Sequence, residues 1–257
     1  MSNRPFVLPK RKVLTADISL GSFAQHIEVM AALGAAHRSS YVCCVNAHMT
    51  VEAKEAEFAA VVNGADLATA DGMPVLRALQ RFHKVEQERV AGNDIMPALM
   101  AKAARSGLGV FLIGATEEVQ QKIVDRAAQE LPDLRIVGRY SPPFAPVEEM
   151  DLEADAERIN ASRAHIVLVS LGCPKQEKWM AAMKGRVNAV MLGMGGAFLL
   201  YAGIDKRAPK WMRDLSMEWV YRLWLEPKRL WRRYVVTNSA FIVLILKEMV
   251  HRAFGGK

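Results

Sequence analysis

The chain has 257 residues, of which 51% are hydrophobic and 24% charged, so it can bury a large core and is too apolar for extensive disorder. Its three cysteines, Cys43, Cys44 and Cys173, provide neither a disulfide framework nor the Cys/His spacing of structural zinc. No apolar run approaches the ~20 residues of a membrane-spanning helix. These features argue against a disulfide-stabilised protein and favour the reducing cytosol.

Positive charge is concentrated at one end of the chain. Residues 205–257 contain 12 Lys/Arg and 5 Asp/Glu, whereas residues 1–204 contain 22 of each. The whole net charge of +7 therefore lies in the last fifth of the sequence. This asymmetry predicts two parts, a neutral body at 1–204 and a basic appendage at 205–257.

Short apolar segments alternate with amphipathic segments along the body, after a basic arm expected at residues 1 to about 15. The predicted strands are 41–45, 65–70, 109–113, 134–137, 165–169 and 189–192. The predicted helices are 50–62, 74–82, 92–104, 117–130, 149–161 and 174–183. This alternation is typical of a parallel sheet covered on both faces. The sequence therefore predicts an α/β fold, a Rossmann-like core followed by a helical C-terminal appendage.

Ligands of such sheets bind at the carboxyl ends of the strands, where five segments are expected to meet. These are 46–48, 71–72, 114–116, 170–176 and 193–196. Several contain glycine, which lets a phosphate or sugar approach the backbone closely.

Asp71 follows the mostly apolar stretch 67–70, and Gly72 permits a sharp turn. The position suits either a general base or a helix N-cap, and it leaves both open. Asn93 or Asp94 is the expected N-cap of the helix at 92–104.

Gln176 carries both a donor and an acceptor that suit a nucleobase or a sugar hydroxyl. Lys175 suits a phosphate or plain solvation, and Cys173 has no identifiable partner base. His48, at a strand end, suits binding and structural roles equally well.

Motifs for cofactors and metals are incomplete. The segment 193–196 is half of a dinucleotide fingerprint, and no acidic residue follows it at the required spacing. The nearest approach to a metal-binding DxD is Asp155-Ala-Glu157, inside a predicted helix. We therefore expect no cofactor and no metal.

Four of the five tryptophans lie among arginines in the appendage: Trp211, Trp219, Trp224 and Trp231. Aromatic and basic residues on amphipathic helices suit the headgroup layer of an anionic membrane. A helical pair packed on the sheet is the alternative, and nucleic acid is the least favoured partner. The apolar run 240–246 would either enter the lipid or pack on the core. When no membrane is present, self-association of the protein would cover the appendage.

Seven short motifs occur in an order that resembles the WecG/TagA/CpsF glycosyltransferase family, over roughly residues 40–235. They are Ala70-Asp71-Gly72, Arg89-Val-Ala-Gly92-Asn-Asp94, Leu171-Gly-Cys-Pro-Lys-Gln-Glu-Lys-Trp179, Gly193-Met-Gly-Gly-Ala-Phe198, Arg207-Ala-Pro209, Glu218-Trp-Val-Tyr-Arg-Leu223 and Glu226-Pro-Lys-Arg229.

The resemblance implies an inverting enzyme on the cytoplasmic face of a bacterial cell membrane. Such enzymes move a sugar from a UDP-sugar to a polyprenyl-diphosphate-linked saccharide during assembly of teichoic acid, common antigen, capsule or exopolysaccharide. It also implies a Rossmann-like catalytic core with a C-terminal appendage that associates with the membrane and completes the active site. A non-catalytic nucleotide-binding regulator docked on anionic membrane is the alternative.

By resemblance, Asp71 is the catalytic base. Arg222, Arg229 and Arg232 bind the diphosphate. The other donor- or acceptor-binding residues are Asn46, His48, Arg89, Asn93, Gln176 and Gly195.

Two positions depart from the family pattern. Asn46-Ala-His48 stands where Thr-x-Asn is common, and Leu199 stands where an aspartate commonly follows the phenylalanine. These departures leave the donor sugar open between N-acetylmannosamine and a hexose such as glucose.

Overall fold

The computed structural model describes residues 7–209, 211–212, 217–225 and 227–254. Within the last two ranges, some side chains also lie outside the description: Glu218, Arg222 and those of residues 228–230 and 232–234.

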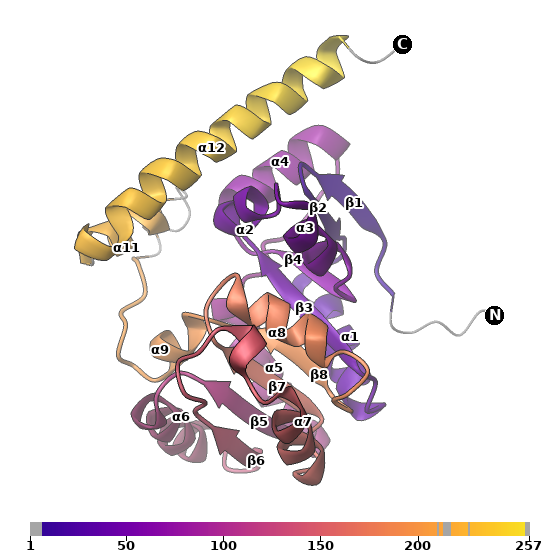
Figure 1. Ribbon diagram of the computed structural model, residues 1–257, viewed down its shortest axis with the longest axis vertical. Coiled ribbons are helices and arrows are strands. Elements are labelled where there is room, and N and C mark those ends of the chain that lie inside the picture. The colour runs from indigo at the N-terminus through magenta and orange to yellow at the C-terminus, as the bar shows by residue number, and fades with distance from the viewer. Residues whose placement is uncertain (1–6, 210, 213–216, 226, 255–257) are drawn as a thin grey trace, which may run out of the picture.

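A six-stranded parallel sheet forms the centre of the molecule, in the order β4-β3-β8-β7-β5-β6 (Figure 1). Its strands are β3 Ser40–Val45, β4 Leu67–Ala70, β5 Gly109–Gly114, β6 Arg135–Tyr140, β7 Ile166–Ser170 and β8 Val190–Gly193. Every residue of β3, β4, β5 and β8 is buried, as expected for strands covered on both sides. The predicted α/β fold is confirmed.

Helices cover both faces of this sheet. One apolar cluster joins it to α1 Phe23–Ala35, α5 Gly92–Ser106, α6 Glu117–Glu130 and α9 Ala197–Tyr201. The other cluster joins it to α2 Ala47–Glu52, α3 Ala56–Asn63, α4 Met73–His83, α7 Leu152–Ala161 and α8 Lys175–Met183. Alternate residues of one strand serve the two clusters: Val42 and Cys44 one, Cys43 and Val45 the other.

Three expectations from the sequence are wrong. Residues 10–19 form an antiparallel hairpin of β1 Lys10–Val13 and β2 Ala16–Ser19, not a basic arm. The hairpin packs against β4, where the Ala68 N–H donates to Ser19 Oγ at 3.1 Å. The helix expected at 50–62 is two helices, α2 and α3. The N-cap of α5 is Ala91 rather than Asn93 or Asp94.

The described part of the appendage includes the helices α11 Glu218–Leu225 and α12 Pro227–Phe254. Helix α12 packs on α2 and runs alongside α4 (Figure 1). Phe241 is buried in this contact, whereas Ile242 and Leu246 are 57% and 55% exposed. The apolar run 240–246 therefore packs on the core with one side and faces outward with the other.

Among the described residues, no helix combines the length and apolar character needed to cross a bilayer.

Two glycines with positive φ, Gly114 at the end of β5 and Gly107 at the C-cap of α5, provide a matched test of local packing. A Cβ at Gly114 (φ 90°) would lie 2.3 Å from the Ser170 main-chain oxygen, whereas one at Gly107 (φ 66°) would meet nothing within 4 Å. We expect Gly114→Ala to lower the free energy of unfolding by ~3 kcal/mol and Gly107→Ala by ~1 kcal/mol, because only the former adds a backbone clash. Urea denaturation measures both, and equal losses would contradict the clash.

Candidate active site

The strand order brings all five predicted ligand segments together at one edge of the sheet. Strands β4, β3, β8 and β7 are consecutive neighbours, so the segments 71–72, 46–48, 193–196 and 170–176 follow one another along the carboxyl edge. This edge carries Asp71 at one side and Gln176 at the other. The segment 114–116 follows β5, the next strand beyond β7.

Asp71 is held where β4 ends. Its N–H donates to the Val45 main-chain oxygen at 3.0 Å, and its own main-chain oxygen accepts from Arg89 Nε at 2.6 Å. The carboxylate Oδ1 accepts the Gly92 N–H at 3.0 Å, which places Asp71 at the N-terminus of α5. The positive end of this 15-residue helix favours a negative charge there.

Asp71 bonds the start of a helix, but this helix is not the one that directly follows it in the sequence. Helix α4, which follows Asp71 directly, has Gly72 as N-cap and no side-chain cap. Asp71 instead bonds the first turn of α5, 21 residues further along the chain. The side chain is only partly buried, and the Gly92 N–H fixes the position of one of its two carboxylate oxygens.

Cys44 is a buried, neutral thiol near the Asp71 carboxylate. Burial, and then the charge of Asp71, raise the pKa of the Cys44 thiol. Burial likewise raises the pKa of the Cys43 thiol. Neither side chain is therefore suited to act as a thiolate nucleophile.

An ion pair links the start of the appendage to α5. The Arg207 guanidinium pairs with the Asp94 carboxylate in the first turn of α5. The neighbouring Ala208 is 4% exposed, so the segment is packed against the body. The sequence motifs include both residues, but Asp94 was expected only as a possible N-cap and Arg207 had no expected role. Their separation of 113 residues gave no local signal of the contact.

Gln176 lies under the glycine-rich end of β8. Its side chain is buried, and Nε2 donates to Glu177 Oε1 at 2.7 Å. A Cβ at Gly193 would lie 3.0 Å from Nε2, and one at Gly195 would lie 3.5 Å from Oε1. Among the described residues, Oε1 has no hydrogen-bond partner, which leaves a buried acceptor at the strand ends.

Burial raises the pKa of the Glu177 carboxyl above its usual value, against the opposing effect of the Gln176 hydrogen bond. The folded chain thus keeps this proton to higher pH than the unfolded chain, and stability falls as pH rises above about 4.5. We expect Glu177→Gln to gain stability relative to the wild type across that rise. Unfolding titrations at several pH values measure the difference, and a constant difference would contradict a raised pKa.

The segment that follows β3 has a structural function. Asn46 Oδ1 accepts the Met49 N–H at 3.1 Å and caps α2. A Cβ at Gly72 would lie 3.2 Å from the Asn46 Cβ, so the two strand ends are in contact. His48 Nδ1 lies 3.6 Å from Glu52 Oε1 and 3.5 Å from Thr237 Oγ1, at the contact between α2 and α12.

The remaining residues of the predicted site are placed as follows. Asn93 lies in the first turn of α5, partly buried beside Gly92. Arg222 belongs to α11, and Arg229 and Arg232 belong to α12, but their side chains lie outside the described residues.

Partly buried polar groups and glycines gather at the carboxyl edge of this parallel sheet, the place where ligands of α/β proteins commonly bind. The model of the glycosyl transferase WecG/TagA/CpsF family matches residues 11–254. The chain belongs to this family. The match confirms the resemblance and extends it to nearly all of the hairpin at the N-terminal end and to the whole of α12. A glycosyltransferase requires a sugar donor and an acceptor.

Proposed function

We propose that this glycosyltransferase moves a sugar, with inversion, from a UDP-sugar to a polyprenyl-diphosphate-linked saccharide during the synthesis of a bacterial cell-surface polysaccharide. The observation that carries the proposal is the fixed carboxylate of Asp71 at the end of β4. Family membership supports the reaction class.

The reaction is a single in-line displacement at the anomeric carbon of the donor. The acceptor hydroxyl gives its proton to Asp71 as its oxygen bonds to that carbon, and the bond to the UDP oxygen breaks. The sugar passes through an oxocarbenium-like state between them. We assign the negative charge of the departing UDP to Arg222, Arg229 and Arg232, whose guanidinium groups suit a diphosphate.

Gln176 is the proposed contact to the donor. Its buried Oε1 is an acceptor for an N–H or O–H group of the nucleobase or sugar. Gly195 has φ of 49° and no side chain, which allows the donor phosphates to approach the backbone. Asn46 follows β3, between the ends of β4 and β8, while Arg89 bonds the Asp71 main-chain oxygen and Asn93 lies in the first turn of α5; we assign all three to contacts with the two sugars.

Helix α12 supports a location on the cytoplasmic face of the membrane. Among the described side chains of this helix, eight large apolar ones are about half exposed or more: Trp231, Val235, Val236, Ile242, Val243, Leu246, Val250 and Phe254. Exposed apolar surface on a helix within a basic segment suits an interfacial position. The enzyme would then meet its acceptor at the membrane surface, where the lipid part of the acceptor is embedded.

A donor screen tests the proposal. We expect UDP to be released from one class of UDP-sugar, N-acetylhexosamine or hexose, only when a short prenyl-diphosphate saccharide is present. A coupled assay for UDP measures the rate, and mass spectrometry of the acceptor identifies the product. Binding of UDP-sugar without UDP release or product from any donor would instead support a non-catalytic regulator.

A further inference from the structure

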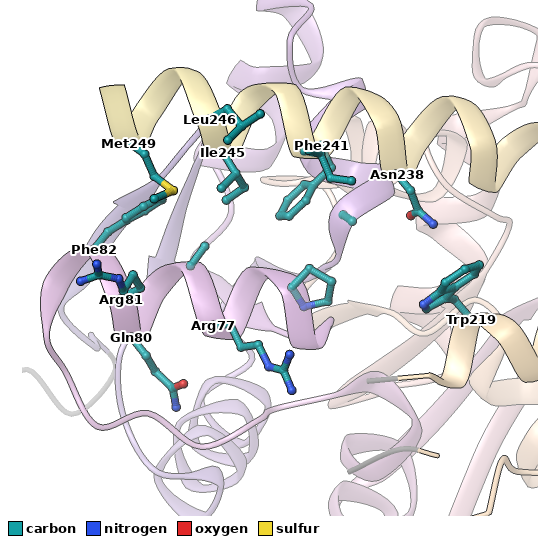
Figure 2. A pocket seen from close by; sticks show the side chains of 14 residues that line it. Arg77, Gln80, Arg81, Phe82, Trp219, Asn238, Phe241, Ile245, Leu246 and Met249 are labelled. Carbon is teal, nitrogen blue, oxygen red and sulfur yellow. The ribbon is translucent and has the colours of Figure 1, made fainter. Parts of the chain in front are cut away.

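A groove of about 900 Å³ runs between α4 and α12 (Figure 2). Phe241, Ile245 and Met249 extend from α12 toward α4, and Phe82 extends from α4 toward Met249. Other residues that line the groove include Ala47, Pro74, Arg77, Arg81, Ile242 and Leu246. A volume of this size is typical of a small-molecule site, and most of its lining is apolar.

The groove leads away from the candidate active site. Ala47 and Pro74 line it, and they belong to the first turns of α2 and α4, directly beyond Asn46 and Gly72. Because α4 has 11 residues, its length is ~16 Å. A molecule in the groove therefore has one end near Asp71 and extends along α4 toward Phe82.

The same groove opens onto the outward side of α12. Ile242 and Leu246 line it and are also more than half exposed, so its wall continues into the apolar surface assigned to the bilayer. A lipid chain can pass from one to the other without crossing a polar surface.

The charge along the groove fits an anionic ligand. Arg77 and Arg81 stand one helical turn apart on α4 and line its edge. Within the described part of the chain, no ion pair to either is present, and no lining residue is acidic. An apolar trough edged by cations suits a molecule with a long hydrocarbon chain and a diphosphate.

We infer that the groove between α4 and α12 binds the first isoprene units of the acceptor's prenyl chain, with Arg77 and Arg81 at the rim, where their positive charge attracts its diphosphate. The inference rests on the proposed function, and it adds a site at which the enzyme holds the lipid rather than only the saccharide. The chain would leave the bilayer beside Ile242 and Leu246, which brings the saccharide toward Asp71.

Photolabelling tests the site without any need for turnover. The probe is a prenyl diphosphate with a diazirine on its first isoprene units, added to the full chain in non-ionic detergent. We expect labels within 74–82 and on the α12 residues that line the groove, such as Phe241, Ile245 and Met249, displaced by an unlabelled long-chain prenyl diphosphate but not by phosphatidylglycerol. Labels confined to outward residues such as Val236 and Val243, or displaced equally by phosphatidylglycerol, would overturn the inference.

A pair of adjacent variants tests the consequence for transfer. Ile242→Asp places a charge in the groove wall, and Val243→Asp places the same charge on a neighbouring residue that does not line it. In detergent, we expect the wild type and Val243→Asp to use a long prenyl acceptor at least tenfold better, by kcat/KM, than one with a short alkyl chain. Ile242→Asp should lose most of that preference.

A preference retained in Ile242→Asp, or absent from the wild type, would overturn the inference. Failure of the wild type to transfer to either acceptor would overturn the proposed function, while the labelling pattern would still decide whether the groove holds the lipid.

Discussion

Asp71→Asn is expected to lower the turnover number for sugar transfer by ~10²–10⁴-fold, because an amide cannot take the acceptor proton. Asn keeps an oxygen that accepts the Gly92 N–H, so the link between β4 and α5 survives. Binding of the UDP-sugar should persist, since the glycines at the end of β8 lie two strands away and Gln176, which follows β7, lies three strands away. Single-turnover transfer and donor calorimetry measure the two effects separately.

The control for this variant lies at the other end of the same strand. Asp66 precedes β4, and its Oδ2 accepts the Tyr41 N–H at 3.0 Å, much as Asp71 accepts that of Gly92. Asp66 also pairs with Lys184 at 2.8 Å, far from the carboxyl edge of the sheet. Asp66→Asn should reduce stability and leave the turnover number near that of the wild type. Equal turnover in Asp71→Asn and the wild type would remove Asp71 from the mechanism.

The sheet was predictable because its signal is local. Buried parallel strands are apolar throughout, so β3, β5 and β8 are recognisable as short runs between amphipathic helices. The general tendency of ligands to bind at strand ends then nominated Asp71 and Gln176 without any knowledge of strand order.

Contacts between distant residues were not predictable in the same way. The first N–H of α5 has a non-local partner, the Asp71 carboxylate, so a search for a cap in the adjoining sequence gave Asn93 or Asp94 instead. The hairpin β1–β2 was missed because β1 reads Lys-Arg-Lys-Val, with only Val13 fully buried. Its strand character comes from pairing with β2.

The break between α2 and α3 was missed for a backbone reason. Glu55 adopts an extended conformation, φ −73° and ψ 127°, and starts α3 as its N-cap. No glycine or proline lies at 53–55, so the apolar periodicity continued through the turn. The appendage posed a related difficulty, because hydropathy alone could not tell which side of 240–246 packs on the body.

The outward surface of α12 leads to the second large expected effect. Val236 and Val243 are two helical turns apart, 60% and 49% exposed, and do not line the groove. Fully burying an exposed valine contributes ~1.5 kcal/mol, and about half of each side chain remains to be buried. Val236→Ser with Val243→Ser should therefore weaken binding to anionic vesicles by ~10-fold. Sedimentation with phosphatidylglycerol vesicles measures this, and transfer to a vesicle-borne acceptor should fall in parallel.

Two observations separate loss of the membrane contact from general damage. Val7, at the opposite end of the chain, is 67% exposed, and Val7→Ser removes similar apolar area without touching α12; it should bind vesicles as the wild type does. Transfer by the double variant to a short, water-soluble acceptor should remain close to that of the wild type, because the groove and the carboxyl edge are unchanged. Vesicle binding by the double variant at the wild-type level would mean that this surface of α12 does not face the bilayer, and the basic residues alone would then have to account for any membrane association.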